Sequence, residues 1–471
     1  MEAAEKNREA LFRETDFLSG GGEFRGSPWD IVWRDPHYES RGKTALPPPM
    51  MQKAMTEVLT RGTPRGKAAV YIHIPFCRLA CTYCAFYKKQ TDEAQQAAYV
   101  ERILAELAFL QKMPYVGKSQ IAAVFFGGGT PSILTADEIL RIVAAVGRTF
   151  SLTPDVEITL EASLSDMTEE KLAAAMAGGV NRFSFGVQSF QTKIRQRVGR
   201  PVPREEAIEK LRRFSDLSEN IIIDLIYGLP GETEETMRQD IRDAMTARVT
   251  GLDLYKLQLL PHSVLARQFA DSGKPLDVVE LGKLFSAAEE ELERGRAENI
   301  SFCHWRYRPS ERSVYNRMAL DGSDVFALGM ACGGSVGGIS FMKPMADAMY
   351  QKTSAMGYVP MAGKKKKAGS SFLGALARMC GEGRLDVARL TAACPFPLEP
   401  FLRPVCDTWA SWGLLEKDEA GYRYTSPGRF WNRVMQRHLL RGAEYVMYGA
   451  PEPEDEARRA GTKWEDMGNL R

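Results

Sequence analysis

The segment YIHIPFCRLACTYCAFYK, residues 71–88, places Cys77, Cys81 and Cys84 directly after the apolar run AAVYIHI. Thiolates are the usual ligands of iron–sulfur clusters, and a short loop brings several of them to one cluster. Three thiolates fill three irons of a 4Fe–4S cluster and leave the fourth iron open to another ligand. The segment therefore predicts a cluster at the end of a strand, with one coordination position left for a small molecule.

A zinc site made of the three cysteines and His73 is the alternative interpretation of this segment. His73 lies on the expected strand, where its side chain alternates with its neighbours instead of turning with the loop. Structural zinc sites also tend to take their ligands as pairs of closely spaced cysteines. Three buried apolar cysteines are a further alternative, but their spacing coincides with one strand-to-helix loop. We therefore carry the cluster interpretation forward.

The composition sets the broad class of protein. A chain of 471 residues with 44% hydrophobic residues is long enough for two or three domains. Its net charge of +2 predicts no broad basic surface for nucleic acid. Eight cysteines, three of them clustered, indicate a reducing compartment and not a disulfide framework. The charged start and the lack of an apolar run near the ~20 residues of a bilayer span predict a cytoplasmic protein without membrane insertion.

Six short apolar runs alternate with amphipathic segments through the first two thirds of the chain. The runs are AAVYIHI, IAAVFFGGG, VEITLEA, RFSFGVQ, IIIDLIYGLP and LDLYKLQLL. This repetition predicts an α/β fold with a parallel sheet covered by helices, as an open or closed barrel. In such barrels the chemistry gathers at the carboxyl ends of the strands. Cys77, glycines 127–129, Glu161, Gln188 and Asp224 all fall at these ends.

Shifts in composition predict the domain boundaries. We expect an N-terminal extension at 1–65, with one helix near residues 50–60, followed by the barrel at 66–300. After it we expect an irregular, barrel-packed substrate region at 301–362, a lysine-rich linker at 363–371, a small helical, winged-helix-like domain at 372–450 and a charged tail at 451–471. The C-terminal domain lacks a basic recognition face, so we expect it to have a structural or substrate-covering role.

The C-x3-C-x2-C motif, with Tyr83 before the last cysteine, resembles the signature of the radical S-adenosylmethionine (SAM) enzymes. The surrounding residues resemble the branch that contains the oxygen-independent coproporphyrinogen oxidases, the related heme chaperones and the anaerobic heme-degrading methyltransferases. The resemblance covers roughly residues 65–345, where five separated motifs occur in order. It implies a radical SAM partial (β/α)6 barrel, one 4Fe–4S cluster on the three cysteines, and SAM bound to the open iron.

The resemblance also implies which residues contact SAM. FFGGGTPS contributes Gly128, Gly129 and Thr130, where glycines let a ligand approach the backbone closely. The other implied positions are Tyr71, Tyr83, Glu161, Gln188, Arg200, Asp224, Tyr255 and Gln258. Tyr71, Tyr255 and Gln258 are expected to line a first and a second SAM pocket, because two SAM molecules distinguish this branch.

Two of these positions have plain physical alternatives. The guanidinium group of Arg200 can donate two parallel hydrogen bonds to a carboxylate. The alternative is that Arg200 is a cation on the protein surface. Asp224 interrupts an otherwise apolar strand, and burying an unpaired carboxylate is costly. It is therefore either a catalytic residue at the ligand site or a structural partner of a neighbouring loop.

The region after residue 300 separates the members of the branch. The heme chaperones carry a His-Asn pair that is missing here, whereas ERSVYN followed by a glycine-rich stretch resembles the heme-degrading methyltransferases. A tetrapyrrole brings two propionates, for which arginines are suitable partners. We expect the substrate residues to be His304 as a ligand of heme iron, Arg306, Arg308, Arg312 and Tyr315, although His304 is alternatively an exposed loop residue.

The resemblance thus implies a methyltransferase that opens heme, releases its iron and takes electrons from a flavodoxin-type donor. A coproporphyrinogen oxidase and a non-catalytic heme chaperone remain the alternatives.

Overall fold

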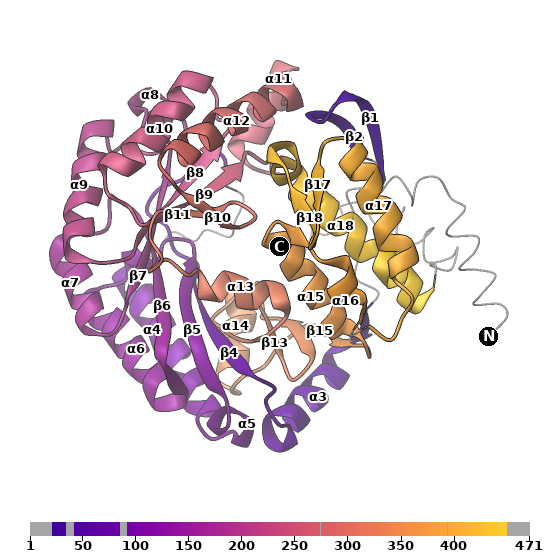
Figure 1. Ribbon diagram of the computed structural model, residues 1–471. Coiled ribbons are helices and arrows are strands. Elements are labelled where there is room, and N and C mark those ends of the chain that lie inside the picture. Colours follow the sequence, from indigo (N-terminus) through magenta and orange to yellow (C-terminus); the bar gives the residue numbers. More distant parts are fainter. Residues whose placement is uncertain (1–20, 34–41, 85–91, 274, 393, 450–471) are drawn as a thin grey trace. The chain divides into compact units, whose positions relative to one another are not determined.

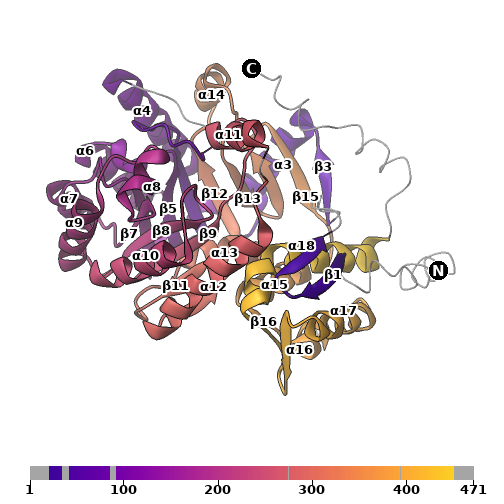
Figure 2. The same ribbon diagram turned by 90° about the horizontal axis from the view of Figure 1, so that it is seen from above.

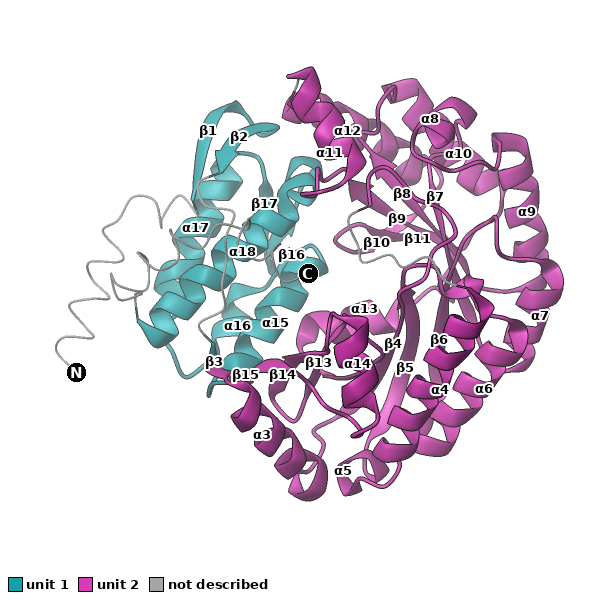
Figure 3. Cartoon of the chain, turned by 180° about the vertical axis from the view of Figure 1, so that it is seen from behind, with its two compact units in different colours: residues 1–44, 366–471 teal, residues 45–365 magenta. Residues whose placement is uncertain are grey.

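The computed structural model describes residues 21–33, 42–84, 92–273, 275–392 and 394–449. These residues form two compact units, one of residues 45–365 and one of residues 1–44 together with 366–471 (Figure 3). Within the described residues, no helix has both the length and the apolarity that crossing a membrane requires.

Six parallel strands form the centre of the larger unit. They are β4 (Lys67–Ile74), β5 (Gln120–Gly128), β6 (Ser151–Ala162), β7 (Arg182–Gln188), β8 (Ile221–Tyr227) and β9 (Gly251–Lys256). Each strand pairs in parallel with the next one along the chain. The sequence prediction of a radical SAM-type parallel α/β sheet is confirmed. We call the carboxyl ends of these strands the barrel mouth.

Helices follow the strands and cover the outer face of the sheet (Figure 1 and Figure 2). They are α4 (Glu93–Leu110), α5 (Pro114–Gly117), α6 (Ala136–Thr149), α7 (Glu169–Ala177), α8 (Thr192–Arg197), α9 (Arg204–Leu217), α10 (Glu234–Thr246), α11 (Val264–Ser272) and α12 (Val278–Arg294), with a 3-10 turn at Pro131–Ile133. Local sequence starts several of them: Asp92 accepts a hydrogen bond from the amide of Gln95, and Thr135 and Thr233 each begin a reciprocal capping box.

The sheet continues on both sides of the six strands. Beyond β9 lie β11 (His304–Arg306) and β10 (Glu298–Ser301), and beyond β4 lie β12 (Asp324–Leu328), β13 (Gly333–Val336), β14 (Ile339–Met342), β15 (Ala362–Lys366) and β3 (Lys43–Leu46). The helices α13 (Val314–Asp321) and α14 (Asp347–Ser354) belong to the same region. The expectation of an irregular segment at 301–362 was wrong, because these residues extend the sheet.

The lysine-rich segment is also more ordered than its composition suggests. Ala362–Lys366 forms β15, which pairs antiparallel with β14 through Lys364 opposite Ser340. The linker interpretation of 363–371 is therefore corrected for the residues that belong to this strand. The helix expected near residues 50–60 is present as α3 (Pro48–Arg61), with Met51, Met55 and Leu59 on its buried side.

The smaller unit contains helices and a three-stranded antiparallel sheet. Its elements are the hairpin β1 (Gly22–Ser27) and β2 (Asp30–Trp33), then α15 (Ser370–Gly381), β16 (Arg384–Leu385), α16 (Val387–Ala392), α17 (Glu399–Ser411), β17 (Leu415–Asp418), β18 (Gly421–Tyr424) and α18 (Ser426–Tyr448). The Trp33 ring packs against Trp409 and Trp431, so residues 21–33 of the expected N-terminal extension are folded into this unit. The expected charged tail at 451–471 lies outside the described residues.

Candidate active site at the barrel mouth

Cys77, Cys81 and Cys84 lie on the loop that follows β4, residues 75–84, which we call the cysteine loop. All three side chains are half-buried, and none forms a disulfide. In the described parts of the chain, no three His, Cys, Asp or Glu side chains gather closely enough to hold a single metal ion. A four-iron cluster is wider than one ion, so its thiolates need not converge on one point. Three thiolates on a short loop are the donor set of such a cluster.

The glycine motif after β5 holds the first half of the cysteine loop. The amide of Gly129 donates to the carbonyl of Ile74 (2.7 Å), and the amide of Thr130 donates to the carbonyl of Phe76 (2.8 Å). The Thr130 hydroxyl lies 3.4 Å from Sγ of Cys77. A Cβ on Gly129 would lie 2.5 Å from the Phe76 carbonyl oxygen and 3.0 Å from this sulfur. Glycine is required here because the two segments approach so closely.

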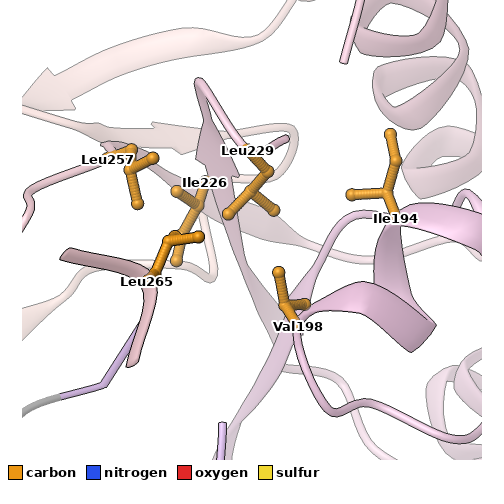
Figure 4. Packing of buried hydrophobic residues seen from close by; sticks show 6 residues of the cluster. All are labelled: Ile194, Val198, Ile226, Leu229, Leu257 and Leu265. Carbon is orange, nitrogen blue, oxygen red and sulfur yellow. The ribbon is translucent and has the colours of Figure 1, made fainter. Parts of the chain in front are cut away.

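The second half of the cysteine loop is fixed to the opposite side of the mouth. The Thr82 amide donates to the carbonyl of Val198 (3.3 Å), and the Thr82 carbonyl accepts from the amide of Leu265 (2.8 Å). Below these contacts lies an apolar cluster of Ile194, Val198, Ile226, Leu229, Leu257 and Leu265, against which Tyr83 packs (Figure 4). The loop is therefore held from β5 on one side and from α8 and α11 on the other.

Glu161 and His73 both contact Gly128 at the end of β5. The Gly128 amide donates to Oε2 of Glu161 (3.2 Å), and a Cβ at this residue would lie 2.5 Å from the His73 ring. Burial raises the pKa of Glu161 to about 7, against the lowering effects of the Gly128 amide and Arg182. Burial lowers the pKa of His73 to about 4, and its Nε2 has no hydrogen-bond partner among the described residues. The mouth thus contains polar groups that the protein itself does not fully satisfy.

Arg200 and Gln188 lie together on the β7 side of the mouth. Arg200 donates to the Tyr83 hydroxyl (2.9 Å). A Cβ on Gly186 would lie 2.8 Å from Nε2 of Gln188 and 3.1 Å from a guanidinium nitrogen of Arg200. Burial lowers the pKa of Arg200, but the charges of Tyr83 and Cys81 outweigh it and raise the pKa. Its buried Nε has no partner in the described structure, so a donor is left for an anionic ligand.

Asp224 on β8 stands opposite Asp253 on β9 in the parallel register. The hydroxyl of Ser184 lies 3.4 Å from Oδ1 of Asp224. Burial, followed by the charges of Asp253 and Glu161, raises the pKa of Asp224 well above its ordinary value. The structure does not decide between the two interpretations of Asp224. It faces other acids inside the barrel, and it accepts one weak structural hydrogen bond from Ser184.

The remaining predicted SAM and substrate residues lie either in an aromatic stack around Tyr71 or at the end of β9. Tyr71 forms an aromatic stack with Phe125 and Tyr315, with ring centroids 6.1 and 5.8 Å away. Tyr255 and Gln258 lie at and beyond the end of β9, and 41% of the Tyr255 surface is exposed. Contacts join Gly129, Thr130 and Arg200 to the cysteine loop, and the roles of all the predicted SAM and substrate residues stay predictions.

The three arginines expected to receive propionates (Arg306, Arg308 and Arg312) do not reach the mouth. Arg306 stands opposite Gly251, the first residue of β9. Arg312 donates to the side chain and carbonyl of Asp155 in the first half of β6. Gly251 begins β9, whose six residues span roughly 20 Å, and Asp155 lies in the first half of β6. Arg306 and Arg312 therefore lie away from the mouth, while a propionate contact by any of the three arginines stays a prediction.

His304 is neither an exposed loop residue nor available to heme iron. Its side chain is 1% exposed. Nδ1 lies 3.0 Å from Oδ1 of Asp253, and Nε2 lies 3.0 Å from Oε1 of Glu311, so both ring nitrogens are in use. The expected iron ligation by His304 is corrected, because a ligand nitrogen has to be free of such a partner.

Sequence reasoning missed the acids and the arginine around His304. Asp253 interrupts the apolar strand LDLYKLQLL in the same way as Asp224 interrupts β8, so the same argument about buried carboxylates finds it. Glu311 carries no such signal because it lies in a polar stretch, and Arg182 carries none because it is the first residue of the run RFSFGVQ, at the edge of a polar segment. Both are nevertheless almost completely buried and form an ion pair of 3.0 Å.

Comparisons with known proteins agree with this geometry. Residues 71–244 match the model of the radical SAM superfamily. Anaerobilin synthase from Escherichia coli O157:H7 is 30% identical over 391 residues, which cover 82% of this chain and 87% of that protein. The heme chaperone HemW from Lactococcus lactis is 32% identical, but the match covers 42% of this chain and 50% of that protein.

Among solved structures, the chain is similar in fold to coproporphyrinogen III oxidase (HemN) from Escherichia coli, a radical SAM enzyme. The two superpose with a TM-score of 0.72 at 21% sequence identity, over 84% of this chain and 94% of that one. The likeness extends over most of both chains.

Proposed function

This chain belongs to the radical SAM superfamily, in the branch that contains anaerobilin synthase, and from that premise we propose that it degrades heme. The observation that supports the proposal is the extent of the match, which runs through 87% of anaerobilin synthase, compared with 50% of the heme chaperone from Lactococcus lactis and 70% of that from Synechocystis. The proposed reaction opens the porphyrin ring, transfers a methyl-derived carbon from SAM, and gives a linear tetrapyrrole and free iron.

The residues at the mouth support the cofactor part of this proposal. Cys77, Cys81 and Cys84 would hold a 4Fe–4S cluster, and the cluster with SAM supplies a carbon-centred radical when bound. The buried, incompletely paired guanidinium of Arg200 suits the carboxylate of SAM. Gly128 and Gly129 let the end of β5 approach His73 and the cysteine loop closely, which positions the loop for the cluster.

Two SAM molecules are part of the proposal. One SAM would occupy the open iron, and that position accepts no second molecule. A second SAM beside Tyr71, Tyr255 and Gln258 would therefore be the source of the transferred carbon. An electron donor of the flavodoxin type would reduce the cluster. The apolar mouth residues would exclude water from the reacting groups.

The test is anaerobic incubation of the reconstituted protein with heme, a chemical reductant and SAM that carries a trideuterated methyl group. We expect loss of heme, a tetrapyrrole that has gained the labelled carbon, and deuterium in 5′-deoxyadenosine, all by mass spectrometry. Cys77→Ala is the control for reactions that do not need the cluster.

Two other outcomes would overturn the proposal. Decarboxylation of coproporphyrinogen with heme untouched would make the chain a coproporphyrinogen oxidase. Heme that is bound tightly and recovered unchanged in every reducing condition would make it a heme chaperone. Conversion of heme without any carbon from SAM in the product would exclude methyl transfer from the proposed reaction.

A further inference from the structure

A chain of buried charges runs through the barrel interior below the mouth. Arg182 donates from Nε to both oxygens of Glu311 (3.2 and 3.0 Å), and Glu311 faces Nε2 of His304 (3.0 Å). Nδ1 of the same histidine faces Asp253 (3.0 Å), which stands opposite Asp224 in the next strand. Except for the half-buried Asp224, these side chains are at most 6% exposed.

This arrangement fixes the charge of His304. An imidazole between two carboxylates has an acid at each nitrogen, so it is doubly protonated and donates in both directions. Burial lowers the pKa of His304, but Asp253 and Glu311 outweigh it and raise the pKa to about 9. Burial raises the pKa of Glu311, but Arg182 and His304 bring it down to about 2. Two cations and two anions therefore balance one another in the interior.

The same contacts make Asp253 and Asp224 unequal. Asp253 has His304 beside it, and although burial raises its pKa, the histidine lowers it below the ordinary value. Among the described residues, Asp224 has no cation at hydrogen-bond distance, and it faces both Asp253 and Glu161. Two neighbouring carboxylates in a buried site do not both ionise, so one of them keeps a proton.

We propose that His304 is a positioning residue that keeps Asp253 ionised, so that Asp224 carries the proton and meets a ligand at the barrel mouth as a neutral hydrogen-bond donor. His304, which the sequence suggested as a ligand of heme iron, would thus act on the SAM end of the site through Asp253. The groups that face Asp224 are Asp253, Glu161, Ser184, Arg182, Arg200 and Tyr255, and those that face His304 are Asp253 and Glu311. Asp253 is faced in addition by Arg182, Tyr255 and the thiol of Cys303, whose Sγ lies 3.5 Å from Oδ1.

The inference concerns the site of the proposed function, but its test uses SAM cleavage without heme. A failure of the heme proposal therefore leaves this test unaffected. The rate of 5′-deoxyadenosine formation is measured anaerobically from about pH 6 to about pH 8, where the wild-type histidine stays charged. Glu161, whose pKa is about 7, titrates in this range in the wild type and in the variants alike, so the wild-type pH profile is the reference for the comparison.

His304→Gln keeps a polar side chain of similar size but removes the cation. Asp253 and Asp224 then compete for one proton, so the ratio of the variant's SAM-cleavage rate to the wild-type rate should fall at least about fivefold as the pH rises across the range. The double variant His304→Gln/Asp253→Asn removes the competing acid as well, and its profile should return to the wild-type shape. A single variant that is uniformly slower, with the wild-type pH profile, would overturn the proposal and leave His304 a structural role.

Asp224→Asn tests the protonation state without disturbing the histidine. Asparagine is a neutral donor, so SAM affinity measured by equilibrium dialysis should stay within about threefold of wild type if Asp224 carries a proton. A loss of about tenfold or more would mean that the ionised carboxylate is the required form, and the proposal would fail. This measurement also covers the case in which His304→Gln does not fold.

Discussion

Buried polar groups are paired to different extents at the barrel mouth and in the barrel interior. At the mouth, Nε of Arg200 and Nε2 of His73 are buried without a hydrogen-bond partner among the described residues. In the interior below it, His304 uses both ring nitrogens and Glu311 uses both carboxylate oxygens, although Nη2 of Arg182 is buried there without a partner among the described residues. An unsatisfied buried donor costs free energy unless a ligand pairs with it, whereas a paired network supports the fold. The comparison therefore sets a largely paired network, which holds the site in place, against mouth residues that suit a ligand.

Removing a cysteine should have the largest effect, because no other residue replaces a cluster thiolate. Cys77→Ala, Cys81→Ala or Cys84→Ala should reduce iron content after anaerobic reconstitution and abolish formation of 5′-deoxyadenosine. Cys394→Ala, in the smaller unit, is the matched control and should retain both. Stoichiometric zinc without iron in the anaerobically purified wild type would contradict the cluster interpretation.

Breaking the interior network should be the next largest effect and should act on stability. Glu311→Gln leaves Arg182 and His304 buried with less compensating charge, so we expect a loss of about 3–5 kcal/mol in the free energy of unfolding. Glu298→Gln removes the exposed partner of Arg306 and should change this free energy far less. Denaturant titration of both variants measures the difference. Equal, small losses would show that the network does not support the barrel.

Arg200→Ala should weaken SAM binding without a comparable loss of stability. A charge-assisted hydrogen bond contributes about 1.5–3 kcal/mol, which corresponds to a roughly 10- to 150-fold higher dissociation constant. Arg197→Ala, from the same turn but with an exposed side chain, serves as the control. Equilibrium dialysis with SAM compares the two. Unchanged SAM affinity in Arg200→Ala would move the ligand away from this side of the mouth.

The smallest effect is expected from the arginines at the amino ends of the strands. Arg306→Ala, Arg308→Ala and Arg312→Ala should leave the KM for heme within about twofold of wild type, because surface substitutions far from a site change little. Heme consumption at several heme concentrations measures this. A selective rise in KM for one of them would place the substrate at the other end of the barrel.

Local sequence was sufficient to place the three cysteines on one loop and to predict the repeating fold. The three cysteines lie within one short loop, so their proximity needs no long-range contact. The alternation of apolar runs and amphipathic segments predicted the parallel sheet because both periodicities are local properties of strands and helices. Gly128 and Gly129 were also predictable, since glycine marks close approach of the backbone.

The tertiary structure decided the direction in which residues after 300 run. β11 pairs antiparallel with β9, with His304 opposite Asp253 and Arg306 opposite Gly251. The chain therefore moves away from the mouth as it passes from His304 to the arginines. No local pattern distinguishes this direction from the opposite one, because a strand has the same periodicity either way. That pairing buried the histidine between two acids and carried the arginines to the far end of the barrel.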